Sequence, residues 1–208
     1  MSRDSFCAAR CITALCCTLL LREVVKRALN GMAVGRYTIL TYQARVPVGE
    51  HNLPEIPAGM LDGSGHFKGV AAEEMEEECD IVISEDELID LTELAYGSRW
   101  RGMIPSAGGC DEFIRLFLFR RQVEQQTLDD LEGRLTGLRE EGELIKLHII
   151  PLEEAWRATP DGKALSVMAL YDRLGSAGKL PTQIVTPETA PGQCTTQSHV
   201  LTQQPVGR

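Results

Sequence analysis

Residues 59–81 read GMLDGSGHFKGVAAEEMEEECDI, and the second half of this stretch decides what kind of structure the chain forms. Six of the eight residues from 73 to 80 are acidic. Ala71, Met75 and Cys79 recur at a spacing of four, which places them along one side of an α-helix. The pattern therefore predicts a helix over residues 70–79 with one apolar side.

The glutamates of this helix form a second pattern. Glu77 and Glu78 come three and four residues after Glu74, and all three are predicted to share the face opposite the apolar side. Like charges at this spacing destabilise a helix by about 0.2–0.5 kcal/mol per pair. A hard divalent cation with oxygen ligands would reverse the sign of that interaction. Two interpretations stay open, a solvated acidic surface and a site for a divalent metal ion.

The composition describes a globular chain with an acidic surface. Its 208 residues are 43% hydrophobic and 25% charged, with a formal net charge of -9. This length suits one domain, which we expect over residues 1–175. Residues 176–208 are rich in Thr, Gln, Pro and Ser and are predicted to be a disordered tail. The negative charge favours cationic ligands and argues against nucleic acid as a partner.

The cysteines and the apolar run over residues 11–21 bear on location. Seven cysteines are present, four of them at Cys7, Cys11, Cys16 and Cys17. The sequence has no pair of zinc-knuckle spacings, so we expect buried, reduced thiols in a cytoplasmic protein. The run over residues 11–21 is too short to cross a membrane, and no membrane partner is expected. A signal peptide and import into an organelle stay open.

Runs rich in β-branched and aromatic residues predict strands over residues 11–21, 36–46, 88–96, 112–121 and 143–151. Between the first two of these strands, residues 22–36 are predicted to be a turn or a short helix. Residues 48–59 are predicted to be a loop with a short extended piece, because each proline disfavours helix at the preceding residue.

Helices are expected late in the chain. Ser84 and Glu87 have the spacing of a capping box, which predicts a brief helix. Longer helices are predicted over residues 152–159 and 163–175. Strands interleaved with helices predict an α/β (α+β) fold, a sandwich with a mixed sheet between helices.

The opening stretch resembles the Nudix box, G-x5-E-x7-R-E-U-x-E-E-x-G-U, where U is an apolar residue. The positions that match in register are Gly59, Glu74, Met75, Glu77, Glu78 and Ile81. Three positions differ: Gly65 stands at the early glutamate, Glu73 at the arginine and Asp80 at the late glycine.

Other segments strengthen the resemblance. TYQARVPVG, EIPAGMLD, PSAGGCDE and TGLREEGELIKLHIIPLEEAWR are similar to the nucleoside-diphosphate-sugar branch of the Nudix family, which holds ADP-sugar and ADP-ribose diphosphatases. The likeness runs over residues 12–174. It implies a Nudix-type α/β/α sandwich that hydrolyses the diphosphate of a nucleoside diphosphate sugar, with Mg²⁺ or Mn²⁺, to a nucleoside monophosphate and a sugar phosphate.

The resemblance also implies roles for individual residues. Metal ligation falls on the Ala58 carbonyl, Glu74, Glu78 and Glu143. Catalytic roles fall on Glu141, as the base for the attacking water, and on Glu77, beside the metal. Substrate contacts fall on Arg45, Glu55 and Glu112.

The departures from the box carry expectations of their own. Glu73 replaces an arginine that braces a catalytic glutamate in the family, so we expect metal binding to persist and catalysis to be weaker or differently tuned. The alternative is a catalytically weak or inactive domain that binds a nucleotide sugar or a protein. The N-terminal subdomain is expected to be shortened, which leaves a homodimer open.

Overall fold

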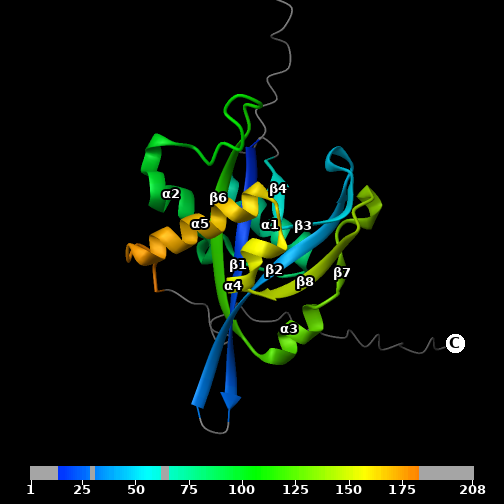
Figure 1. The fold of residues 1–208 in the computed structure, drawn as a ribbon, viewed down its shortest axis with the longest axis vertical. Helices are drawn as coiled ribbons and strands as arrows, with labels where there is room; N and C mark the ends of the chain where they lie inside the picture. Colours follow the sequence, from blue (N-terminus) through cyan, green and yellow to red (C-terminus); the bar gives the residue numbers. More distant parts are fainter. Residues whose placement is uncertain (1–13, 29–30, 62–65, 183–208) are drawn as a thin grey trace, which may run out of the picture.

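The computed structural model describes residues 14–28, 31–61 and 66–182, with side chains from residue 35 onward except that of Glu141 (Figure 1). The strands are β1 (Ala14–Ala28), β2 (Gly31–Arg45), β3 (Glu50–Glu55), β4 (Ala58–Met60), β5 (Ile89–Asp90), β6 (Phe113–Val123), β7 (Leu135–Thr136) and β8 (Ile145–Pro151). The α-helices are α1 (Phe67–Cys79), α2 (Leu91–Tyr96), α3 (Gln125–Leu131), α4 (Leu152–Ala158) and α5 (Gly162–Ser176). Short 3-10 turns are η2 (Val46–Val48), η3 (Glu85–Glu87), η4 (Gly97–Arg99) and η5 (Arg139–Glu141).

The described strands form one mixed sheet. Its order is β5-β6-β1-β2-β8-β7, with β3 paired to β2 and β4 paired to β1. Strands β1 and β6 run parallel, and every other pair of named strands is antiparallel. The prediction of a mixed sheet in an α/β fold is confirmed.

Both faces of the sheet are buried. Successive side chains of a strand point to opposite faces, so neighbouring buried residues of one strand belong to different faces. In β6, Leu116 and Leu118 belong to one buried cluster, and Phe117 and Phe119 belong to a second. This alternation makes the sheet the middle layer of a sandwich.

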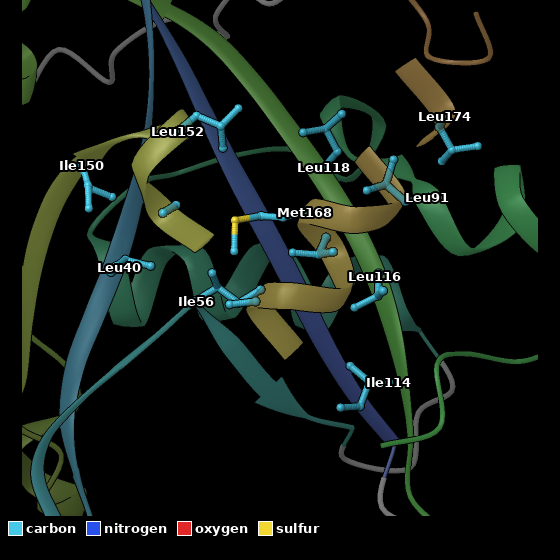
Figure 2. Packing of buried hydrophobic residues seen from close by; sticks show 13 residues of the cluster. Leu40, Ile56, Leu91, Ile114, Leu116, Leu118, Ile150, Leu152, Met168 and Leu174 are labelled. Atoms are coloured by element: carbon cyan, nitrogen blue, oxygen red, sulfur yellow. The ribbon is translucent and has the colours of Figure 1, made fainter. Parts of the chain in front are cut away.

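Helices cover the two faces separately. Leu152 of α4 and Met168 of α5 pack in the first cluster, beside Leu116 and Leu118 (Figure 2). Met75 of α1 packs in the second cluster and is fully buried. The predicted α/β/α arrangement is thereby confirmed, and α1 lies on the face opposite α4 and α5.

The predicted helix over residues 70–79 is confirmed as α1, which begins three residues earlier. The capping box is also confirmed: the Ser84 backbone N–H donates to the Glu87 carboxylate at 2.7 Å, and η3 follows. Asp80 ends α1 with φ 54° and ψ 41°, in the left-handed conformation that the box normally gives to glycine.

Residues 22–28 and 31–36 were wrongly predicted to be a turn or short helix; residues 29–30 of the same prediction lie outside the described residues. Strand β1 runs to Ala28 and β2 begins at Gly31, and the two pair antiparallel, with Arg22 paired to Tyr37 and Ala28 to Gly31. Figure 1 shows these paired strands projecting past the other strands. The β-branched pair Val24 and Val25 suits a strand, and pairing across the hairpin outweighs the local turn signals.

The strand predicted over residues 88–96 is also wrong for most of its length. Only Ile89–Asp90 form a strand, and α2 follows. The Asp90 side chain accepts the backbone N–H of Glu93 at 2.8 Å, so it caps the helix and ends the strand. Helix α3, with Leu128 and Leu131 buried, lies in a mostly polar stretch that gave no helix signal. The segment predicted to be a loop with a short extended piece, residues 48–59, holds β3 and the start of β4.

Two other expectations concern cysteines and the tail. Cys79 is buried as predicted, whereas Cys110 is exposed; the side chains of Cys7, Cys11, Cys16 and Cys17 lie outside the described residues. Helix α5 extends to Ser176, and residues 183–208 of the predicted tail also lie outside them. Among the described residues, no helix has the length and apolar character needed to cross a bilayer.

Candidate active site

Helix α1 presents two glutamates to strand β4. Met75 is fully buried and fixes the rotation of the helix about its axis. Residues four apart nearly align along a helix, so Glu74 and Glu78 lie on one flank. Ala58 donates its backbone N–H to Glu78 Oε2 at 3.1 Å. Glu74 lies so close to Gly59 that a Cβ at this position would overlap its carboxylate.

A cavity of about 840 Å³ opens beside these two carboxylates. Its walls come from β2, β3, β4, α1, the start of α5 and the loops that precede β6 and β8. The ionisable side chains in these walls are Glu55, Glu74, Glu78, Glu112, Glu143, Asp161, Arg45 and Lys163. Six acids and two bases give the cavity a net negative charge, which favours a cation, while the two bases offer contacts to an anion.

Burial alters the proton equilibrium of Glu78, whose exposed fraction is 5%. Loss of hydration, together with the nearby Glu74 carboxylate, raises the pKa of Glu78 to about 8, against the opposing effect of the Ala58 N–H. Glu143 and Glu55 also contribute to the rise. A divalent cation bound here would favour the ionised form and displace the proton.

The two bases of the cavity share a buried carboxylate. Glu55 is 3% exposed and accepts hydrogen bonds from Arg45 Nε at 2.5 Å and from Lys163 Nζ at 2.8 Å. Lys163 also donates to Asp161 at 3.0 Å. Burial opposes ionisation of Glu55, but the hydrogen bonds from Arg45 and Lys163 outweigh it and lower the pKa of the carboxyl. The Arg45 side chain is 42% exposed and lines the cavity.

Most of the residues that the sequence singled out meet in this one cavity: Arg45, Glu55, Ala58, Glu74, Glu78, Glu112 and Glu143. Glu141 ends the turn η5, two residues before Glu143, and its side chain lies outside the described residues. The roles assigned to these residues stay predictions.

Glu77 lies elsewhere. It lines a separate hollow of about 500 Å³ together with Glu73, Asp80 and Arg134. The expected common face therefore holds for Glu74 and Glu78 but not for Glu77 in this cavity, because a residue three positions away is rotated by about 60° around the helix. Arg134 forms an ion pair with Asp80, so it places a positive charge on the flank where Glu73 replaces an arginine.

Sequence reasoning missed Lys163 and Asp161. Asp161 is the N-cap of α5 and accepts the backbone N–H groups of Lys163 and Ala164. An aspartate directly before a helix is a recognisable capping signal. Nothing in the sequence indicated that this helix begins beside Glu55, which is 108 positions away from Lys163.

The donor set of the cavity fits a hard divalent cation. In the described part of the chain, no three acidic, histidine or cysteine side chains converge closely enough to form a finished metal site. The carboxylates of Glu74, Glu78 and Glu143 and the carbonyl of Ala58 nonetheless offer only oxygen ligands, which Mg²⁺ prefers. Burial, and after it the Glu74 carboxylate, raise the pKa of Glu78, and a cation bound at these oxygens would oppose both effects.

Family models and solved structures do not by themselves assign the chain to a family. No family model matches the chain. Two solved structures are similar over 80% of it: a mutT/nudix family protein from Listeria innocua, with TM-score 0.48, 14% identity and 95% of that chain covered, and the C. elegans Ap4A hydrolase, with TM-score 0.46, 12% identity and 99% covered. Both scores are too low to carry an argument.

A curated relative gives the assignment. The chain is 44% identical over 154 residues, 74% of its length, to "Nudix hydrolase 14, chloroplastic" of Arabidopsis thaliana. The matched part spans about half the length of that relative. Identity at this level over so many residues reflects common ancestry, and the chain therefore belongs to the Nudix hydrolase family.

Proposed function

We propose that the protein hydrolyses the diphosphate bond of a nucleoside diphosphate sugar of the ADP-ribose or ADP-glucose type. The products are a nucleoside monophosphate and a sugar phosphate. The observation that carries this proposal is the joint presence, in one cavity, of the α1 carboxylates Glu74 and Glu78 and of two basic side chains, Arg45 and Lys163. A metal-bound diphosphate requires both kinds of partner.

Glu74, Glu78, Glu143 and the Ala58 carbonyl would hold Mg²⁺ or Mn²⁺. Such an ion, when bound, neutralises phosphate charge and acidifies a water molecule. Arg45, whose side chain is 42% exposed, binds a substrate phosphate through its guanidinium, because the fork of this group matches phosphate oxygens. Glu55 orients that guanidinium through two hydrogen bonds, at 2.5 and 3.3 Å.

Glu141 is the proposed base that accepts a proton from the attacking water. The turn η5 ends at Glu141, and Glu143 two residues later lines the cavity, so this loop reaches the site. The relative's name states a hydrolase of the Nudix family, which agrees with the reaction class. The substrate follows from the resemblance to the diphosphate-sugar branch.

The test is a panel of ADP-ribose, ADP-glucose and UDP-glucose, each with Mg²⁺ or Mn²⁺, with release of nucleoside monophosphate as the readout. We expect turnover of at least one substrate, and Glu78→Gln to lower kcat/KM by about 100-fold or more, as losses at metal sites do. Glu76→Gln, an exposed change on the same helix, is the matched control and should leave kcat/KM within about twofold.

A second candidate function is binding without turnover. Glu73 favours it, because an acid stands where the family has a bracing arginine. Arg134 favours the enzyme, because it lines the same hollow as Glu73 and places a positive charge on the flank where the family has its arginine. Binding of a nucleotide sugar in a calorimetric titration, with no product from any member of the panel, would select the binding function over the enzyme.

A further inference from the structure

The cavity of about 840 Å³ beside Glu74 and Glu78 is the proposed site of the diphosphate. Next to it lies a hollow of about 430 Å³, which we call the middle hollow because a third hollow lies beyond it. The two share Glu112, Asp161 and Lys163 in their walls, so they adjoin. Ser166 of α5 joins Glu112 and Asp161 in the middle hollow. Carboxylate and hydroxyl oxygens accept hydrogen bonds from hydroxyl groups, which suits a ribose.

A third hollow of about 300 Å³ adjoins the middle one through shared Ile104 and Glu112. Its walls include Trp100, which is 50% exposed, Phe113 at the start of β6, and the charged residues Arg101, Asp111 and Glu112. Ile104 is 48% exposed in the same walls. The exposed indole of Trp100 offers a flat apolar surface on which an aromatic ring can stack, and the charged residues beside it offer hydrogen bonds to the polar edge of a nucleobase.

The loop that carries Trp100 is held in place. Met103 and Ile114 exchange backbone hydrogen bonds of 2.8 and 2.7 Å, which fasten the loop to β6. A Cβ at Gly102 would come within 2.6 Å of the Ile114 carbonyl oxygen, so only glycine permits this approach. The loop joins α2 to β6 (Figure 1). A fixed loop presents the indole with little loss of conformational entropy on binding.

From this order of walls we infer that the nucleobase of the substrate stacks on Trp100, with its ribose in the middle hollow between Glu112 and Ser166. The inference rests on the proposed function for the diphosphate. It assigns Trp100 and the loop around it to recognition of the base. Arg99, whose guanidinium lies 5.5 Å from the Trp100 ring centroid, supports the indole from one side.

The chain offers a direct optical test, because it has two tryptophans, Trp100 and Trp156. In Trp156→Phe, Trp100 is the remaining tryptophan. We expect ADP with Mg²⁺ to quench its emission in a saturable titration, and ribose 5-phosphate, which has no base, to leave the emission unchanged. In Trp100→Phe the emission of Trp156 should not respond to ADP. An unchanged Trp100 emission with bound ADP would overturn the inference.

Binding and kinetics give a second readout. Trp100→Ala should weaken ADP binding by about 5- to 100-fold, the range for loss of a stacked base, and raise KM more than it lowers kcat. Trp156→Ala is the matched control, since Trp156 is 62% exposed, lies on α4 and has Arg157 at 5.8 Å from its ring. Thermal unfolding of both variants checks that each is folded.

The results separate this inference from the proposed function. If Trp100→Ala hydrolyses nucleotide sugars with the same KM as the parent protein, the base site at Trp100 is refuted and the proposed diphosphatase function stands. Quenching of Trp100 by ADP without turnover on any sugar supports the base site and removes the diphosphatase. Absence of both quenching and turnover overturns both.

Discussion

At the scale of single residues, Glu78 carries the strongest electrostatic signal of the site. It is buried, its backbone carbonyl accepts the Thr136 hydroxyl at 2.5 Å, and its carboxylate accepts the Ala58 N–H. Both ends of the residue are therefore held in place. A fixed, buried carboxyl beside Glu74 is unfavourable when ionised without a cation, and this cost appears in the raised pKa.

The raised pKa predicts how stability depends on pH in the metal-free protein. The pKa of Glu78 rises from an ordinary 4.5 to about 8 on folding, so its contribution to stability is fully present below pH about 4.5 and is lost as the pH rises through about 8. The free energy of unfolding should fall over this window by at most about 1.4 kcal/mol per pH unit. Urea denaturation in EDTA measures it.

Glu78→Gln should flatten that pH dependence, because glutamine has no proton to lose. Glu76→Gln, with its exposed side chain, should keep the slope of the parent protein. A slope that survives in Glu78→Gln would show that another group is responsible.

At the scale of elements, the site depends on the close approach of α1 to β4. Strand β4 pairs with β1 as part of the sheet, and α1 packs on the sheet through Met75, so their separation is set by the core. Gly59 lies where the two elements meet, and the Glu74 carboxylate occupies the space of a Cβ. Glycine is required here for room and not for its backbone angles.

We therefore expect Gly59→Ala to lower the affinity for the metal ion and to change the free energy of unfolding little. The added methyl group must push the Glu74 side chain aside, because Oε1, Cδ and Cγ of Glu74 are the atoms nearest to it, and this movement displaces a proposed ligand. We expect Mn²⁺ affinity to fall by about tenfold to 100-fold in a calorimetric titration, as for other disturbances of metal ligands. Gly108→Ala is the control, since its Cβ meets no atom within 4 Å. Equal Mn²⁺ affinity in the two variants would contradict the prediction.

At the scale of the whole molecule, the Arg45–Glu55–Lys163 cluster ties together distant parts of the chain. Arg45 ends β2, Glu55 ends β3 and Lys163 lies in the first turn of α5. The hydrogen bond from Arg45 to Glu55 joins β2 to β3, and the hydrogen bond from Lys163 to Glu55 joins α5 to β3 across 108 positions of the chain. Breaking a buried ion pair by removing one partner leaves a charge uncompensated.

Lys163→Ala should destabilise the protein by about 2–3 kcal/mol, somewhat less than a fully broken buried pair, because Glu55 keeps Arg45. Urea denaturation measures the change. Lys179→Ala, an exposed lysine beyond α5, should change the free energy of unfolding by less than about 0.5 kcal/mol. Lys163→Arg should recover part of the loss. A stability equal to that of Lys179→Ala would show that the cluster is not structural.

The sequence by itself determined the elements whose signals are local and strong. The acidic helix with its apolar stripe, the capping box at Ser84 and the mixed sheet of an α/β fold all followed from periodicity, spacing or resemblance. Cavity residues such as Glu74, Glu78 and Glu143 were also identified in this way. The helix and the capping box depend on interactions between residues close in the chain. The cavity residues were identified because the resemblance to a family assigns them positions.

Tertiary structure alone decided which side chains meet. It placed Lys163 against Glu55, turned Glu77 toward a separate hollow, and brought the Trp100 loop next to the cavity through Glu112. It also extended β1 to Ala28 and began β2 at Gly31, where pairing between the strands overcame local turn signals. Contacts between residues far apart in sequence arise only when the sheet and its two helical layers assemble, and no local pattern specifies them.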